Sequence, residues 1–168
     1  MSTGRLELQV DEGSIRRLTA ALRAEADGKE LRRELAKNMR DALRPAAAQA
    51  KSAIMTMPSA GSNNARPALR QQIAKKIRPE VKLGGMWTGA RVKARKTFNV
   101  RNFPNAPRRT NSAKGWRTRN FGTDNWRTQY GEPKWFDDSM TRDRALYKEA
   151  VRQAMQDMAD RIADRAGH

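Results

Sequence analysis

Nearly all of the chain's net positive charge lies in one internal stretch, and this uneven distribution constrains the fold more than any other feature. Residues 60–119 hold 16 of the 35 lysines and arginines but a single acid, Glu80, so this stretch carries a net charge of +15. The rest of the chain holds 19 basic and 17 acidic side chains, a net charge of +2. Charges of one sign at this density repel one another unless something anionic neutralises them. The sequence therefore predicts an anionic partner for this stretch.

Length and hydropathy limit the size of the core. A chain of 168 residues suits one domain, and we expect residues 1–168 to form a single domain. The hydrophobic share of 38% and the mean hydropathy of −0.92 are low for a compact soluble domain. Part of the chain is therefore expected to form arms or long loops that order against neighbours.

The two ends of the chain show helical spacing of apolar residues. A short alternating piece, Leu6 to Val10, is followed by a helical pattern that we expect to end at Gly28. A second pattern continues past Pro45 to Ile54, which predicts one long helix kinked at the proline. A last helix is predicted from about Thr141 to Ala166. Its apolar stripe consists of Tyr147, Val151, Met155, Met158 and Ile162.

The middle of the chain has the patterns of short strands. All ten aromatic residues lie from Trp87 onward, which favours an aromatic core among these strands. Residues 89–96 alternate between small apolar side chains and Arg91, Lys93 and Arg95, as in a strand with a solvated cationic face. Residues 116–121 and the region around Val81 to Leu83 predict further strands. The expected fold class is α+β, with a small antiparallel sheet packed against the kinked N-terminal helix and the C-terminal helix.

Residues 97–114 are rich in Asn, Pro and Arg and contain no acid. The stretch is longer than the ~12–15 residues beyond which structureless loops become uncommon in compact domains. We therefore predict an extended basic loop or arm over residues 97–114.

The sequence offers little for catalysis or metal binding. There is no cysteine, and the only histidine, His168, is the last residue, so the usual His/Cys metal sites are not expected. Asp137 and Asp138 are interpreted as the N-terminal acids of a helix, and Gly84-Gly85 as a turn between strands. We predict no catalytic residue, no cofactor, no metal and no small-molecule substrate. An enzyme would need a carboxylate cluster assembled from distant residues: Asp124, Glu132, Asp137 and Asp138.

Membrane segments and leaders are not expected either. No apolar run approaches the ~18–20 residues that a bilayer span needs, and the N-terminus lacks the pattern of a signal peptide. The sequence therefore predicts a protein made and used in the cytoplasm, with no membrane partner.

Three interpretations of the basic stretch remain: a solvated face, a surface for nucleic acid, and a surface for an acidic protein. A solvated face fits scattered charge better than this concentration. Nucleic-acid binding would use phosphate neutralisation, with Phe98, Phe103 and Trp116 near arginines available to stack on unpaired bases. No recognisable nucleic-acid motif is present. Charge alone leaves nucleic acid and acidic protein as alternatives.

Five features follow one another along most of the chain. They are an Ala-rich helix that ends at a proline (Ala46 to Pro58), Leu69-Arg70-Gln71-Gln72-Ile73, Phe121-Gly122-Thr123, Pro133-Lys134-Trp135-Phe136, and the C-terminal helix. Each is weak alone, but their order resembles that of the tail-completion or head–tail joining (neck) proteins of long-tailed bacteriophages. Two stretches depart from that pattern: residues 97–114 are longer and more basic, and Trp126 to Tyr130 adds aromatic residues.

The resemblance implies a structural virion protein of the phage neck, assembled in the host cytoplasm. Copies would form a ring of about six subunits, joining the tail tube to the head connector protein and leaving a channel for DNA. The alternative is a sequence-nonspecific nucleic-acid-binding protein. Trp135 and Phe136 are candidates for a subunit interface, or else both pack on the C-terminal helix. Candidates for contact with an acidic neighbour or with DNA phosphates are Arg91, Lys93, Arg95, Arg108, Arg109, Arg117 and Arg119.

Overall fold

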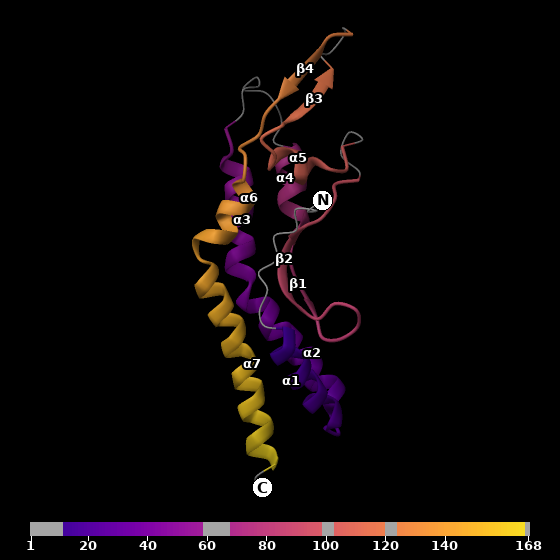
Figure 1. Ribbon diagram of the computed structural model, residues 1–168, viewed down its shortest axis with the longest axis vertical. Coiled ribbons are helices and arrows are strands. Elements are labelled where there is room, and N and C mark those ends of the chain that lie inside the picture. Colours follow the sequence, from indigo (N-terminus) through magenta and orange to yellow (C-terminus); the bar gives the residue numbers. More distant parts are fainter. Residues whose placement is uncertain (1–11, 59–67, 99–102, 120–123, 167–168) are drawn as a thin grey trace. The chain divides into compact units, whose positions relative to one another are not determined.

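The computed structural model describes residues 12–58, 68–98, 103–119 and 124–166, and the short strand predicted at Leu6 to Val10 lies outside them (Figure 1). The fold is α+β, as the sequence predicts. In the described part of the chain the strands form two separate two-stranded antiparallel sheets rather than one sheet. Helices account for most of the ordered residues.

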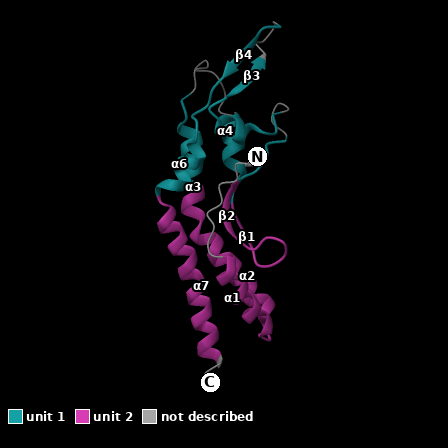
Figure 2. Ribbon diagram, viewed as in Figure 1, with its two compact units in different colours: residues 1–5, 48–78, 94–142 teal, residues 6–47, 79–93, 143–168 magenta. Residues whose placement is uncertain are grey.

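The chain divides into two compact units, each assembled from segments that are far apart in sequence (Figure 2). Unit 1 consists of residues 1–5, 48–78 and 94–142. Unit 2 consists of residues 6–47, 79–93 and 143–168. The division passes through helix α3 and through the first sheet, so neither unit is a continuous piece of sequence.

Three helices build unit 2: α1 (Glu12–Ala24), α2 (Gly28–Ala42) and α7 (Arg144–Ala166). Helix α2 packs against both α1 and α7. Their apolar residues recur at helical spacing, so each helix turns one stripe toward the others. The predicted stripe of α7 is confirmed, except that Ile162 is only half-buried. The buried side chains of these helices include Ile15, Leu22, Leu31, Leu35, Met39, Tyr147, Val151, Met155 and Met158.

Two breaks shape the N-terminal helices. The prediction that Gly28 ends the first helix is wrong, because α1 ends at Ala24 and Gly28 is the first residue of α2. A side chain does not fit at Gly28, since a Cβ there would overlap the carbonyl oxygen of Leu22. Helix α2 ends at Ala42 and α3 (Arg44–Thr56) begins two residues later, with Leu43 between them. Pro45 is the second residue of α3, where its missing N–H removes no helical hydrogen bond. The single kinked helix that the sequence predicts is therefore two helices, and the break between them lies just before the proline.

The first sheet pairs β1 (Ile77–Lys82) with β2 (Gly89–Ala94), close to two of the predicted strands. The Gly84-Gly85 pair lies in the connection between them, as predicted. Beyond the end of β2, the backbone N–H of Arg95 donates to the carbonyl oxygen of Lys76 at 3.0 Å. This pairing therefore continues past the assigned strands.

Unit 1 contains α4 (Ala68–Lys76), α5 (Ala106–Thr110), β3 (Trp116–Arg119), β4 (Trp126–Gln129) and α6 (Trp135–Arg142). The prediction of an extended arm over residues 97–114 is wrong for its second half. Pro107 lies in the first turn of α5, where proline favours a helix, and Ala106, Pro107 and Thr110 are buried. The Thr97 hydroxyl donates to the carbonyl oxygen of Phe103 at 2.7 Å and so joins the start of the stretch to the residues just before this helix.

Helix α6 anchors unit 1 through its first two residues. The rings of Trp135 and Phe136 meet edge to face, with centroids 5.5 Å apart. Trp135 Nε1 donates to Thr110 Oγ1 at 3.2 Å, and the Phe136 N–H donates to Asn111 Oδ1 at 2.9 Å. Asp137 and Asp138 lie in the first turn of α6, which confirms them as N-terminal acids, although α6 is a helix separate from α7. These aromatic residues therefore belong to a helical core and not, as predicted, to the strands.

Candidate anion-binding surface

The two units differ sharply in charge. Unit 1 contains 18 lysines and arginines but only four acids, a net charge of +14, whereas unit 2 contains 17 and 14, a net charge of +3. Four carboxylates are too few to neutralise eighteen cations. Most of the positive charge of unit 1 must therefore be balanced by solvent ions or by a partner.

Several cations of unit 2 form ion pairs with carboxylates of the same unit. Arg161 on α7 pairs with Glu34 of α2 at 2.5 Å, and Arg165 pairs with Asp27, which directly precedes α2, at 2.8 Å. The hydrogen bond from Arg165 holds the pKa of the Asp27 carboxyl below its ordinary value of 3.8. These two pairs join α7 to α2 and its N-terminus at the surface.

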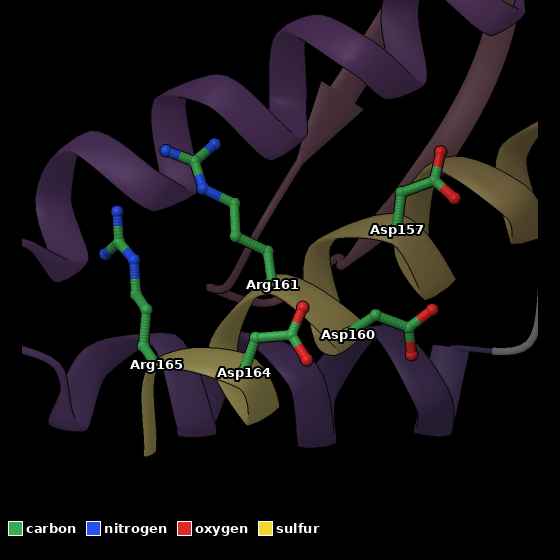
Figure 3. A pocket seen from close by; sticks show the side chains of 5 residues that line it. All are labelled: Asp157, Asp160, Arg161, Asp164 and Arg165. Atoms are coloured by element: carbon green, nitrogen blue, oxygen red, sulfur yellow. The ribbon is translucent and has the colours of Figure 1, made fainter. Parts of the chain in front are cut away.

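An open hollow beside α7 is lined by acidic and basic side chains of that helix (Figure 3). Its two arginines are the ones that pair with Glu34 and Asp27. Two of its carboxylates accept hydrogen bonds within the helix, Asp157 from Gln153 and Asp160 from Gln156, both at 2.7 Å. The hollow is thus a surface of satisfied charges and offers no reactive group.

Two of the seven candidate contact residues, Arg91 and Lys93, fall in unit 2. The predicted solvated face of residues 89–96 is wrong at Arg91, whose side chain is only 9% exposed. Its guanidinium lies 3.9 Å from the ring centroid of Trp87 and pairs with Glu80 at 2.6 Å. Glu80, the one acid of the basic stretch, supplies the charge that allows this arginine to be buried. Lys93 is half-buried.

The other five candidates belong to unit 1. Arg108 and Arg109 are exposed in the last turn of α5, and Arg95 is exposed just after β2. Arg117 and Arg119 lie on β3, and the side chain of Arg117 is exposed. The candidates of residues 95–119 therefore belong to one unit, and Arg91 and Lys93 belong to the other.

The β3–β4 hairpin carries the most accessible part of this charge. Its register pairs Trp116 with Gln129, Arg117 with Thr128, Thr118 with Arg127 and Arg119 with Trp126. Alternate pairs share a face, so Arg117, Arg119 and Trp126 lie on one face, and Trp116 and Arg127 on the other. The ring of Trp116 contacts that of Phe103, with centroids 5.8 Å apart. Gly115 leads into β3 with a positive φ, where a Cβ would overlap the carbonyl oxygen of Gln129.

Strand β4 was not predicted from the sequence. Residues 126–130 alternate in character, and Gly122 to Asn125 has the composition of a turn, so together they form a hairpin signal. Every residue of β4 is exposed, and so is Tyr130 after it. Trp126 to Tyr130, which depart from the neck-protein pattern, therefore supply one of the two strands of the candidate surface.

Trp135 and Phe136, the candidates for a subunit interface, are buried within unit 1. They are 2% and 7% exposed, and their contacts are with each other and with Thr110 and Asn111. Both side chains are therefore used within unit 1, and a role for them at a subunit interface stays a prediction. The alternative, that both pack on the C-terminal helix, misses the contacts to α5 and Asn111.

Other kinds of site are not found among the described residues. No cluster of three or more potential metal ligands occurs in residues 12–58, 68–98, 103–119 and 124–166. Of the four candidate carboxylates, Asp137 accepts a hydrogen bond from Asn111 Nδ2 at 3.1 Å, a structural role at the start of α6. Within the same ranges, no helix is both long and apolar enough to cross a membrane. Comparison with known proteins gives no match, whether to a protein-family model, a curated protein or a solved structure.

Proposed function

We propose that this chain is a non-enzymatic structural protein of the bacteriophage neck. Copies form a ring of about six subunits that joins the tail tube to the head connector and leaves a channel for DNA. The order of elements supports this proposal. An Ala-rich helix (α3) is followed by α4 with Leu69 to Ile73, a short hairpin, α6 behind Pro133, and the amphipathic α7.

The observation that carries the proposal is the imbalance between the two units. Unit 2 is a helical unit with near-neutral charge, whereas unit 1 holds +14 and presents it on exposed residues such as Arg108, Arg109 and Arg117. The repulsion among the cations of such a unit is relieved when an anionic neighbour neutralises them. An assembly protein meets such a neighbour in its final position.

The mass of the purified protein, measured by light scattering at low and high salt with and without DNA, tests the proposal. A ring gives one mass, several times that of the 19.0 kDa chain, that persists at high salt and does not depend on DNA. Subunits that stay monomeric and gather on DNA in proportion to its length would contradict the ring.

The second candidate function is nonspecific nucleic-acid binding by a monomer. It is favoured by one observation, the guanidinium of Arg117 lying 5.6 Å from the ring centroid of the exposed Trp126. Binding through phosphates weakens steeply as salt rises, because counterions are released on binding. The same light-scattering series therefore separates the two functions, since the ring keeps its mass at high salt whereas the monomeric binder returns to the mass of one chain.

A further inference from the structure

The β3–β4 hairpin exposes large aromatic side chains beside cations. Trp126 is 52% exposed and Tyr130, which follows β4, is 66% exposed. A two-stranded hairpin is marginally stable alone, and exposed aromatic residues on it do not contribute to a core. Their presence on this hairpin therefore calls for an explanation outside the packing of unit 1.

The register places these aromatic and cationic groups on one face. Arg117 on β3 shares a face with Trp126 on β4, and its guanidinium lies diagonally across from the indole ring. Neither strand contains an acid, since β3 reads Trp-Arg-Thr-Arg and β4 reads Trp-Arg-Thr-Gln. The face thus combines an exposed ring with the exposed cation of Arg117.

The same combination recurs at a second place in unit 1. Phe98 is 67% exposed, and Lys96 Nζ lies 5.8 Å from its ring centroid. Unit 2 has a cation beside a ring as well, Arg91 at Trp87, but there Glu80 completes the pair and Arg91 is buried. The exposed Lys82 of unit 2 also lies 5.9 Å from the Trp87 ring centroid, but Trp87 is half-buried. Among the described residues, pairs in which both the ring and the cation are exposed are found in unit 1.

We propose that the β3–β4 hairpin is a stacking platform for single-stranded nucleic acid. An unpaired base stacks on Trp126, and a neighbouring phosphate is neutralised by Arg117. The inference rests on the proposed function only in that unit 1 meets an anionic partner, and it identifies that partner as nucleic acid. An acidic protein would need the charges alone, whereas every base has a flat face that an exposed ring can cover. Bases in a duplex are already stacked, which favours the single strand.

Binding of fluorescently labelled oligothymidine to the full-length protein, measured by anisotropy at fixed low salt, tests the proposal. Stacking of one base contributes enough binding free energy that its loss in W126A should weaken binding about tenfold. W126F, which keeps a ring, should retain most of the affinity. A duplex of equal phosphate number should bind W126A and wild type alike. The matched control is L146A, a substitution of the 67% exposed Leu146 on α7 of unit 2, which should not change binding.

A second pair of variants separates local contact from total charge. R117Q and R33Q each remove one positive charge, the first on the hairpin and the second on the exposed part of α2. The proposal expects R117Q to weaken oligothymidine binding several-fold more than R33Q. Equal effects would mean that the hairpin is not the site.

Two further outcomes would overturn the inference. One is unchanged oligothymidine binding by W126A. The other is competition by polyglutamate that matches an oligonucleotide of equal charge, which would point to an acidic protein partner. Light scattering of W126A keeps these failures distinct from a failure of the proposed function. A ring that forms normally while oligothymidine binding is indifferent to Trp126 removes the stacking platform and leaves the neck assignment in place.

Discussion

Units 1 and 2 are of comparable size but handle charge in opposite ways. In unit 2, pairs such as Arg161 with Glu34 and Arg91 with Glu80 let cations stabilise the fold they belong to. Unit 1 has four acids for eighteen cations and must balance its charge elsewhere. The difference suggests a division of labour in which unit 2 supplies a self-sufficient scaffold and unit 1 supplies the surface for a partner.

The two units also differ in the buried side chains that form their cores. Aliphatic residues at helical spacing fill unit 2, and Leu22, Leu31 and Leu35 are 0–1% exposed. Unit 1 buries aliphatic residues too, among them Ile54 and Ile73, but it also holds the aromatic pair Trp135 and Phe136, fixed by hydrogen bonds to Thr110 and Asn111. Hydrogen bonds of this kind have strict geometry, so the core of unit 1 is expected to be the more sensitive to single substitutions.

The largest expected effect is at the core of unit 1. W135A removes a buried indole and the donor to Thr110 Oγ1, and should lower the free energy of unfolding by about 3–5 kcal/mol. T110V keeps the size of the side chain but removes the hydroxyl that accepts from Trp135 and donates to the carbonyl oxygen of Ala106, and should cost about 1–3 kcal/mol. Hydrogen exchange should show that W135A exposes the amides of α5 and α6 more than those of α2. Uniform loss of protection would mean that the units do not differ in this way.

The next largest loss of stability is expected at the largely buried ion pair between Arg91 and Glu80. E80Q removes the charge that compensates Arg91, whose side chain is 9% exposed, and should destabilise the protein by about 2 kcal/mol. The double substitution E80Q/R91M should recover part of this loss, because it leaves no buried charge without a partner. Chemical denaturation of the two variants provides the measurement. If E80Q were neutral, Arg91 would resemble the surface cations of unit 1 and the contrast between the units would weaken.

A smaller effect separates exposed cations that have partners from those that balance their charge outside the chain. R161Q breaks the surface pair with Glu34 and should cost about 0.5 kcal/mol, an amount that salt reduces. R108Q in α5 should leave stability unchanged or raise it slightly, because it lowers the mutual repulsion within unit 1. Thermal melts at low salt compare the two. A loss for R108Q equal to that for R161Q would indicate an internal partner for Arg108.

The sequence predicted the fold class and the helices well, because helical spacing at residues such as Leu31, Leu35 and Val151 reports burial directly. It failed where a tertiary partner decides the outcome. Arg91 alternates as an outward residue would, but Glu80 and Trp87 make its burial possible. The stretch 103–114 lacks a clear pattern, yet α5 forms because Trp135 covers Thr110.

The candidate surface was predicted only in part, for the same reason. The basic composition singled out the stretch that contains α5 and β3, in which Arg108, Arg109 and Arg117 are exposed. Charge counting could not reveal which of its cations share a face with an aromatic ring. That required the pairing of β3 with β4, and hence residues 126–129, which lie outside the basic stretch.

The smallest effect is a pH dependence that belongs to unit 2. Arg165 holds the pKa of Asp27 below its ordinary value of 3.8, so the folded protein keeps this carboxyl ionised where the unfolded chain has protonated it. The stability from this pair is therefore fully present above that ordinary value and is lost as the pH falls through the lower pKa of the folded state. D27N should remove this component, and R165Q should remove it equally, since both abolish the pair. Melting temperatures of the three proteins between about pH 6 and pH 2 should converge at the acid end, because acid alone then breaks the pair in the wild type. Curves that stay parallel down to the lowest pH would show that the pair does not contribute to the stability of unit 2.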